Sequence, residues 1–279
     1  MTRLRAWFLL PTWLLLVSTI AIPLGIIVYY SLLTRGAYGG AGQPLTLESY
    51  TRLFDPLYAA IFLRSFLFAL VATVLCLILG FPLALFIARS AAWRNLYLAL
   101  VILPFWTSFL IRLYAWIFLL RDSGLINTLL LSLGWLRQPL PLLYNNGAVL
   151  LGLVYSFLPF AVLPMYASLE RMDKNLLEAA ADLGARPLTV LMRVMVPMAV
   201  PGIWAAGLLV FIPCLGTYLV SDLLGGSKTV LVGNLVQNQF TAARDWPFGS
   251  AISLVLMLAA VLLILMLRGK SNTENVELL

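Results

Sequence analysis

The sequence alternates between long apolar runs and short polar stretches. Six of the runs approach the roughly 20 residues that an α-helix needs to cross the hydrocarbon core of a bilayer. A signal peptide would have a shorter apolar core and a small-residue cleavage site, so the first run is interpreted as a retained helix. The pattern predicts an all-α integral membrane protein with one transmembrane domain over residues 1–279. Its spans are expected at 8–32, 65–87, 96–120, 148–169, 198–224 and 249–267.

The composition supports this class and excludes several others. Hydrophobic residues make up 62% of the chain and charged residues only 10%, whereas a soluble domain carries roughly a quarter charged residues. The net charge of +7 is typical of basic residues that set topology beside membrane spans, so nucleic acid is not an expected partner. Histidine is absent, and Cys76 and Cys214 lie inside apolar runs as packing thiols. We therefore predict no catalytic residue, no metal site and no enzymatic activity.

The longest charged interruption covers residues 170–197. Asn175 is a predicted N-cap, and Glu178 three residues later completes a capping box. Gly184 suits the left-handed position that closes a helix, and Pro187 suits the first turn of a second short helix. The sequence therefore predicts two short helices joined by a turn between the fourth and fifth spans.

An even number of spans places both termini on the same side of the membrane. Lys and Arg are denser in the short segments of that side, which include the loop 170–197. Because cytoplasmic loops are enriched in these residues, we expect both termini and this loop to be cytoplasmic. The expected location is a bacterial inner membrane, with the chain in contact with the lipid bilayer.

The same loop resembles the EAA loop of ABC importer permeases. The pattern is a Glu-Ala-Ala triplet, three residues, a glycine, nine residues and then an apolar stretch ending in proline. This resemblance implies the type I ABC importer permease architecture, with six transmembrane helices and a cytoplasmic coupling helix. It also implies contact with a separate ATPase through Glu178, Ala179, Ala180, Asp182, Gly184 and Arg186. No G-x-x-x-x-G-K-[ST] motif occurs, so the ATPase is expected to be another chain.

Five stretches are similar to the permease subunits of spermidine/putrescine ABC importers, the PotB type. They are LTLESYTRLFDPLY (45–58), LPFWTSFLIRLYAW (103–116), LEAAADLGA (177–185), YLVSDLLGG (218–226) and RDWPFGSA (244–251). The resemblance implies ATP-driven uptake of polyamines from the periplasm by alternating access. It also implies a second homologous permease, an ATPase homodimer and a periplasmic polyamine-binding protein as partners. ATP and magnesium would bind the ATPase, so this chain is expected to carry no cofactor.

A polyamine path needs acidic groups for ammonium ions and aromatic faces for cation–π contacts. Asp222 is the clearest acid near a span, and Tyr218 lies four residues earlier on the same helical face. Trp106, Tyr155 and Phe160 are the aromatic candidates. Structural alternatives remain open for all of these residues except Tyr218. They are capping or an ion pair with Lys228 for Asp222, the interfacial belt for Trp106, and core packing for Tyr155 and Phe160.

Two other transport functions remain as alternatives. The same machine could carry an inorganic anion or ferric ion, and Arg112 in the third span favours an anion. If the substrate is a polyamine, Arg112 would repel it, and we expect this residue to pair with an acid or to face an interface. A self-powered secondary transporter would need intramembrane acid pairs or a proton relay, and the sequence offers neither.

Overall fold

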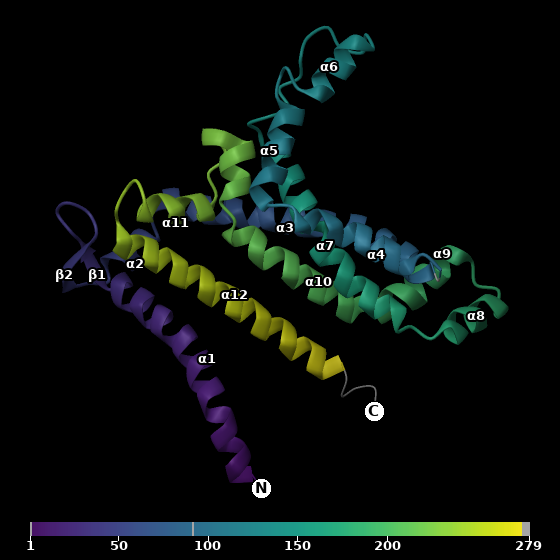
Figure 1. Cartoon of the computed structure of the whole chain (residues 1–279), viewed down its shortest axis with the longest axis horizontal. Helices are drawn as coiled ribbons and strands as arrows, with labels where there is room; N and C mark the ends of the chain where they lie inside the picture. The colour runs from purple at the N-terminus through teal and green to yellow at the C-terminus, as the bar shows by residue number, and fades with distance from the viewer. Residues whose placement is uncertain (1, 91, 275–279) are drawn as a thin grey trace. The chain divides into compact units, whose positions relative to one another are not determined.

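The computed structural model describes residues 2–90 and 92–274, and most of them are helical (Figure 1). Within this part of the chain, five helices are long and apolar enough to cross a membrane, or six if one bent pair counts as a single span. The all-α class is therefore confirmed, with one small β-hairpin that the apolar pattern did not predict. The strands are β1 (Leu33–Arg35) and β2 (Ala41–Leu45).

The helices follow in chain order, with two π-helical segments (η2 and η3) and two 3₁₀ segments (η1 and η4) between them. They are α1 (Thr2–Ser31), α2 (Glu48–Arg52), α3 (Pro56–Arg89), α4 (Arg94–Ile102), η1 (Leu103–Trp106), α5 (Phe109–Leu120), α6 (Leu125–Ser132), α7 (Asn146–Glu170), α8 (Lys174–Asp182), α9 (Pro187–Val190), η2 (Leu191–Met195), α10 (Val196–Gly216), η3 (Ser221–Gly225), η4 (Gly226–Lys228), α11 (Val232–Phe240) and α12 (Trp246–Glu274).

Two of the expected spans differ from the observed helices. The run 96–120 is not one straight helix, because the segments Arg94–Trp106 and Phe109–Ser132 meet at an angle of 89°. Thr107 between them is extended, and its hydroxyl donates a hydrogen bond of 2.7 Å to the Pro104 carbonyl. A threonine hydroxyl that bonds the local backbone in this way offers the chain an alternative to continuing the helix. The run 198–224 is also shifted, since one helical stretch covers Pro187–Gly216 and ends before Thr217.

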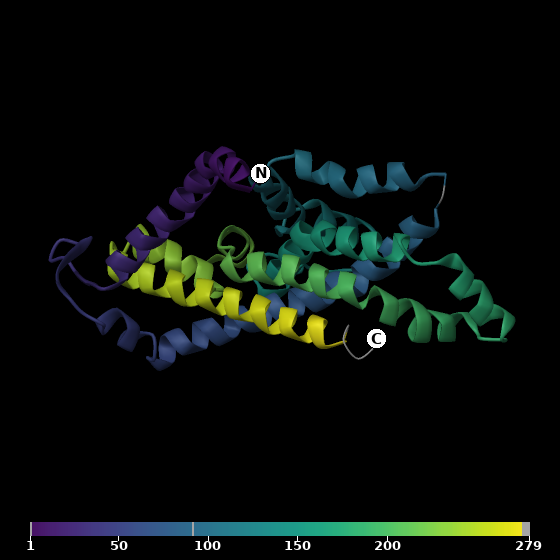
Figure 2. The same cartoon turned by 90° about the horizontal axis from the view of Figure 1, so that it is seen from below.

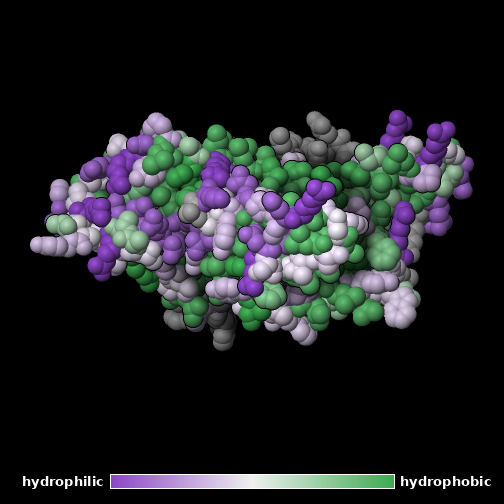
Figure 3. All heavy atoms as spheres, turned by 90° about the horizontal axis from the view of Figure 1, so that it is seen from above, coloured by the Kyte–Doolittle hydropathy of each residue, from purple (hydrophilic) through white to green (hydrophobic). Residues whose placement is uncertain are grey.

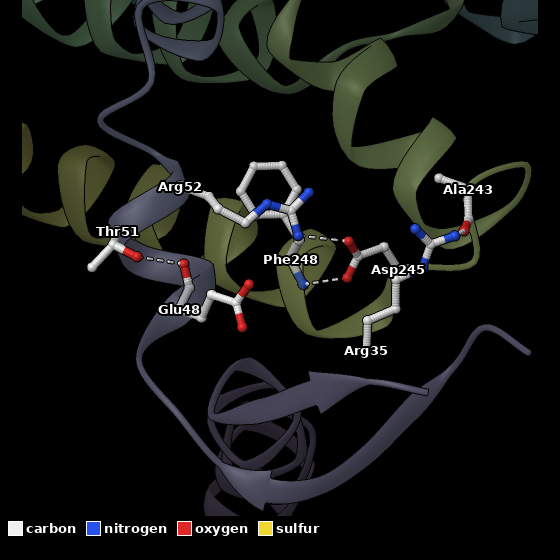
Figure 4. Close-up of polar contacts among 7 residues, drawn as sticks. All are labelled: Arg35, Glu48, Thr51, Arg52, Ala243, Asp245 and Phe248. Carbon is white, nitrogen blue, oxygen red and sulfur yellow. Dashed lines mark hydrogen bonds and ion pairs between the residues drawn. The ribbon is translucent and has the colours of Figure 1, made fainter. Parts of the chain in front are cut away.

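The described chain divides into two compact units. The first comprises the residues up to Ala60 together with Leu235–Leu262, so it holds α1, the hairpin, α2 and most of α12. The hairpin pairs antiparallel, with Thr34 opposite Gly42 and Arg35 opposite Ala41. An Arg35 guanidinium nitrogen then donates to the Ala243 carbonyl at 2.7 Å, which ties the hairpin to the chain just before α12 (Figure 4).

A partly buried ion pair joins α2 to the start of α12 in this unit, with the Arg52 side chain 37% exposed. Arg52 Nη1 lies 2.8 Å from Asp245 Oδ2, and the Asp245 side chain is 2% exposed. The guanidinium also stacks on the Phe248 ring at 4.1 Å, while the Phe248 amide donates to Asp245 Oδ1 (Figure 4). Burial is the largest single influence and disfavours the charged guanidinium, but the hydrogen bonds and charges of Asp245 and Tyr58 together outweigh it, so the pKa of Arg52 is raised. Both stretches belong to the polyamine-permease resemblance, and their contact joins residues 193 positions apart.

The second unit comprises Ile61–Asn234 and the chain from Leu263, and its core lies between α3, α7 and α10. The helices α7 and α10 run side by side in both ribbon views (Figures 1 and 2). Small residues fill their contact. A Cβ on Gly202 would lie 2.5 Å from Ser168 Cβ and 2.8 Å from the Pro164 carbonyl oxygen. Close backbone approach through small residues is how helices associate when lipid removes the hydrophobic drive between them.

This contact gives a test of stability. Gly202→Ala is expected to destabilise the chain by about 1–3 kcal/mol, because the new methyl group overlaps the backbone of α7 and cannot be relieved by rotating a side chain. Thermal unfolding of the purified chain in detergent, followed by circular dichroism, should show a lowered midpoint. Gly207→Ala on the same helix is the matched control, since a Cβ there meets nothing within 4 Å. Equal midpoints for the two variants would contradict the proposed packing role of Gly202.

Candidate functional site

The loop between α7 and α10 begins with α8. Its N-cap is Asp173, whose Oδ1 accepts a hydrogen bond of 2.9 Å from the Asn175 amide. The predicted Asn175 cap is therefore wrong by two residues, and the capping box with Glu178 does not form. Both residue types cap helices well, and the local sequence does not distinguish them. Asp173 takes this position because α8 starts soon after α7 ends, so that Asn175 is already inside the helix.

The end of α8 agrees with the expected glycine turn. Gly184 has φ +78°, and its amide donates to the Ala181 carbonyl at 2.8 Å. The Ala185 amide reaches back to the Ala180 carbonyl at 3.1 Å, which completes a Schellman arrangement. A Cβ on Gly184 would meet nothing within 4 Å, so the backbone conformation and not space requires glycine here. Arg186 occupies the N-cap position of α9 without a side-chain capping hydrogen bond, and the helix begins with Pro187 as predicted.

The loop presents most of its predicted coupling residues to the outside. Glu178, Ala179, Asp182, Gly184 and Arg186 are exposed, and Ala180 is half-buried. Leu183 is 89% exposed at the turn and Leu188 is 70% exposed on α9. In Figure 3, hydrophilic side chains gather at the right-hand end, where Figure 1 places α8 and α9, with hydrophobic surface beside them. An exposed surface that mixes charge with large apolar side chains suits contact with another protein.

Beneath α8 lies a cavity of about 300 Å³. Its walls come from the ends of α3 and α7, from α8 and from η2, and they include Arg89, Glu170, Glu178 and Met195. At the same end of α7, Arg94 Nη1 lies 2.5 Å from Glu170 Oε1, which joins the start of α4 to the end of α7. Glu170 therefore lines the cavity together with Glu178 of α8 and also pairs with Arg94 of α4.

The acidic pathway candidate lies just after a break in α10. The helix ends at Gly216, and the freed Tyr218 carbonyl accepts from the Asp222 amide at 2.9 Å and from the Asn234 side-chain amide at 3.2 Å. Asp222 is exposed, and within the described residues its carboxylate makes no ion pair with Lys228 and no capping hydrogen bond. The structure thus brings Tyr218 and Asp222 into one short turn and leaves the carboxylate available.

The aromatic candidates lie on two other elements. Trp106 is 86% exposed at the bend between η1 and α5. Tyr155 contacts the Trp116 ring at 5.4 Å, and Phe160 contacts the Phe105 ring at 5.2 Å, both edge to face. No ring contact among the described residues connects these side chains to Tyr218. Tyr218 and Asp222 therefore lie together at the turn after α10, while Tyr155 and Phe160 lie on α7 against α5 and η1. Trp106 makes no ring contact with either pair among the described residues.

The structure gives Asn234 and Arg112 surroundings that the sequence did not indicate. Asn234 had no sequence signal, yet its Oδ1 accepts from the Leu231 amide and from Ser221 Oγ while its amide holds the Tyr218 carbonyl. Arg112 is 9% exposed, and the expected ion pair with an acid is not found among the described residues. A charge inside a span costs about 2.5–3.5 kcal/mol on insertion scales.

The chain is similar to known membrane transport proteins over most of its length. Residues 80–269 match the family described as "Binding-protein-dependent transport system inner membrane component". The spermidine/putrescine transport system permease protein PotB of Escherichia coli is 45% identical over 93% of this chain and 95% of that protein. PotB of Haemophilus influenzae is 43% identical over 89% of this chain and 87% of its own length.

A solved structure shares the fold at low sequence identity. It is the crystal structure of a bacterial alginate ABC transporter in complex with an alginate pentasaccharide-bound periplasmic protein, with a TM-score of 0.69 and 19% identity over 94% of this chain and 93% of that chain. The resemblance read from the coupling loop and the four other stretches is thereby confirmed. The chain belongs to the family of inner membrane components of binding-protein-dependent transport systems.

Proposed function

We propose that this chain is the membrane-spanning permease subunit of an ATP-driven importer that moves polyamines such as spermidine and putrescine into the cytoplasm. The observation that carries the proposal is the 45% identity, over nearly the whole chain, to a spermidine/putrescine permease. The whole of residues 1–279 would act as one permease domain, with both termini on the cytoplasmic side.

The partners follow from the same family. A separate ATPase homodimer binds ATP and magnesium and closes on the loop formed by α8 and α9. Glu178, Asp182 and Arg186 offer charges to it, and the small side chains of Ala179 and Ala180 permit close approach. A second, homologous permease completes the pathway, and a periplasmic binding protein delivers the polyamine.

Alternating access would couple the loop of α8 and α9 to the substrate pathway. Closure of the ATPases would press on α8, and α8 is connected to α3, α4 and α7 through the cavity walls and the Arg94–Glu170 ion pair. Asp222 and Tyr218 would meet the ammonium groups, and Trp106, Tyr155 and Phe160 would offer aromatic faces to the substrate.

One alternative has a specific observation in its favour. Arg112 is a buried cation without an acidic partner among the described residues, which would suit an inorganic anion or another non-polyamine solute. The identity to spermidine/putrescine permeases outweighs it, because it extends over nearly the whole chain. A self-powered carrier is disfavoured by membership of a binding-protein-dependent family.

Reconstitution tests the proposal directly. The chain is co-purified with its partner permease and ATPase, placed in lipid, and supplied with the binding protein loaded with spermidine, putrescine, sulfate or ferric ion in turn. ATP hydrolysis is expected to rise with the polyamines and not with the other solutes. Stimulation by sulfate or ferric ion alone would overturn the substrate, and failure of any ATPase to associate would overturn the mechanism.

The turn at Gly184 gives a prediction for coupling. Gly184→Val should reduce co-purification of the ATPase and polyamine-stimulated ATP hydrolysis several-fold, because a β-branched residue at φ +78° costs on the order of 1–3 kcal/mol and reshapes the turn. Gly184→Asn is the control, since asparagine tolerates the left-handed region. Normal ATPase association by the valine variant at normal expression would count against the assigned role of this turn.

The carboxylate of Asp222 gives a prediction for the pathway. Asp222→Asn should lower the rate of spermidine uptake by about tenfold, because a hydrogen bond to a charged group contributes about 1.5–3 kcal/mol. Uptake into proteoliposomes at saturating binding protein provides the measurement. Asp122→Asn, which removes another exposed carboxylate, should leave uptake close to wild type. Wild-type kinetics for the Asp222 variant would remove this residue from the pathway.

A further inference from the structure

The bend between η1 and α5 interrupts a membrane span. Irregular backbone at membrane depth is tolerated where it is buried in protein or lines a cavity. Arg112 lies one turn into α5, directly after this break, and is 9% exposed. Its position combines a buried charge with an interrupted helix, and both features mark functional sites in membrane proteins.

The Arg112 guanidinium is held by rings and not by an acid. Its central carbon lies 4.8 Å from the centroid of Phe105 and 5.7 Å from that of Phe109. Arg112 Nε is buried and has no hydrogen-bond partner within the described residues. Arg52 shows what a structural arginine looks like in the same chain, since it stacks on Phe248 and also pairs with Asp245. Arg112 stacks on aromatic rings as Arg52 does, but among the described residues it has no acidic partner.

The ring cluster continues from η1 onto α7. Phe105 meets Phe160 edge to face at 5.2 Å, and Phe160 lies 6.1 Å from Phe157. Ser156 precedes Phe160 by one helical turn, so the two side chains share a face of α7. The Ser156 hydroxyl is the other buried side-chain atom without a hydrogen-bond partner in the part of the chain that the structure describes.

These features together match the chemistry of an organic ammonium site. Aromatic faces attract ammonium and guanidinium ions through the ring quadrupole, and a free hydroxyl can accept a hydrogen bond from an ammonium N–H. In the structure the only cation stacked on Phe105 and Phe109 among the described residues is the guanidinium of Arg112 itself.

We propose that the faces of Phe105 and Phe109 form an ammonium-binding site, and that the Arg112 guanidinium occupies this site until a substrate ammonium displaces it. Arg112 is thus a tethered competitor that sets specificity. Its guanidinium competes with every ammonium group for the rings, so a ligand with a single ammonium binds weakly. A polycation binds better than such a ligand because its remaining ammonium groups are held elsewhere, as at Asp222. The inference rests on the proposed function for the identity of the ammonium ligand.

Equilibrium binding of radiolabelled spermidine tests the competition. The probe is added to the purified complex of this chain with its partner permease and ATPase, without the binding protein. Arg112→Gln is expected to bind spermidine about tenfold more tightly than wild type, since the competing cation is gone. Arg112→Lys keeps a positive charge and should bind about as weakly as wild type. Adding Phe105→Leu to Arg112→Gln should cancel the gain.

The outcomes separate this inference from the proposed function. A merely structural arginine would give weaker or unchanged binding when replaced, and either result for Arg112→Gln overturns the inference. A gain that survives Phe105→Leu overturns it as well. If Arg112→Gln does not yield a monodisperse complex, Arg112→Met is measured in its place. Spermidine uptake by the wild-type complex decides the proposed function independently of these variants.

Discussion

The packing of α7 against α10 is the contact on which the second unit depends. Lipid supplies no hydrophobic drive between helices, so their association relies on close van der Waals contact. Gly202 permits that contact where α10 crosses Pro164 and Ser168. The loop of α8 and α9 connects the end of α7 to the start of α10. The two points where this loop is anchored are therefore set by how closely these two helices approach each other.

Two departures from regular helix lie next to residues that we propose for the substrate pathway. Prolines inside α7 and α10 do not end either helix, because neighbouring segments and local adjustments satisfy the freed backbone groups. The real breaks occur at Thr107 and Thr217, next to Trp106 and Tyr218. A π-helical segment, Leu191–Met195, lies between α9 and α10. Such segments are frequent at functional sites because they shift side chains out of the regular register.

The chain uses arginine in two physically different ways. Arg52 and Asp245 neutralise each other in a partly buried pair and join α2 to the start of α12, so their role is structural. Arg112 has rings around it and an unsatisfied Nε, so its charge is left without compensation among the described residues. Sequence context did not separate them, since each lies in a stretch that resembles the same family. The difference appears only when the partner of each guanidinium is known.

The sequence by itself determined the membrane class, the approximate spans and the Glu178–Gly184 pattern, because apolar run length and turn chemistry are local properties. It placed the helix cap at Asn175 instead of Asp173, since two neighbouring residues can cap equally well. Tertiary structure decided the pairing of Arg52 with Asp245 and the hydrogen bond from Asn234 to the Tyr218 carbonyl. These contacts join residues 193 and 16 positions apart and depend on which segments meet, so no local pattern encodes them. The bend within 96–120 has a local contact, from Thr107 to Pro104, but the continuous apolar run around it gave no signal that the helix would stop there.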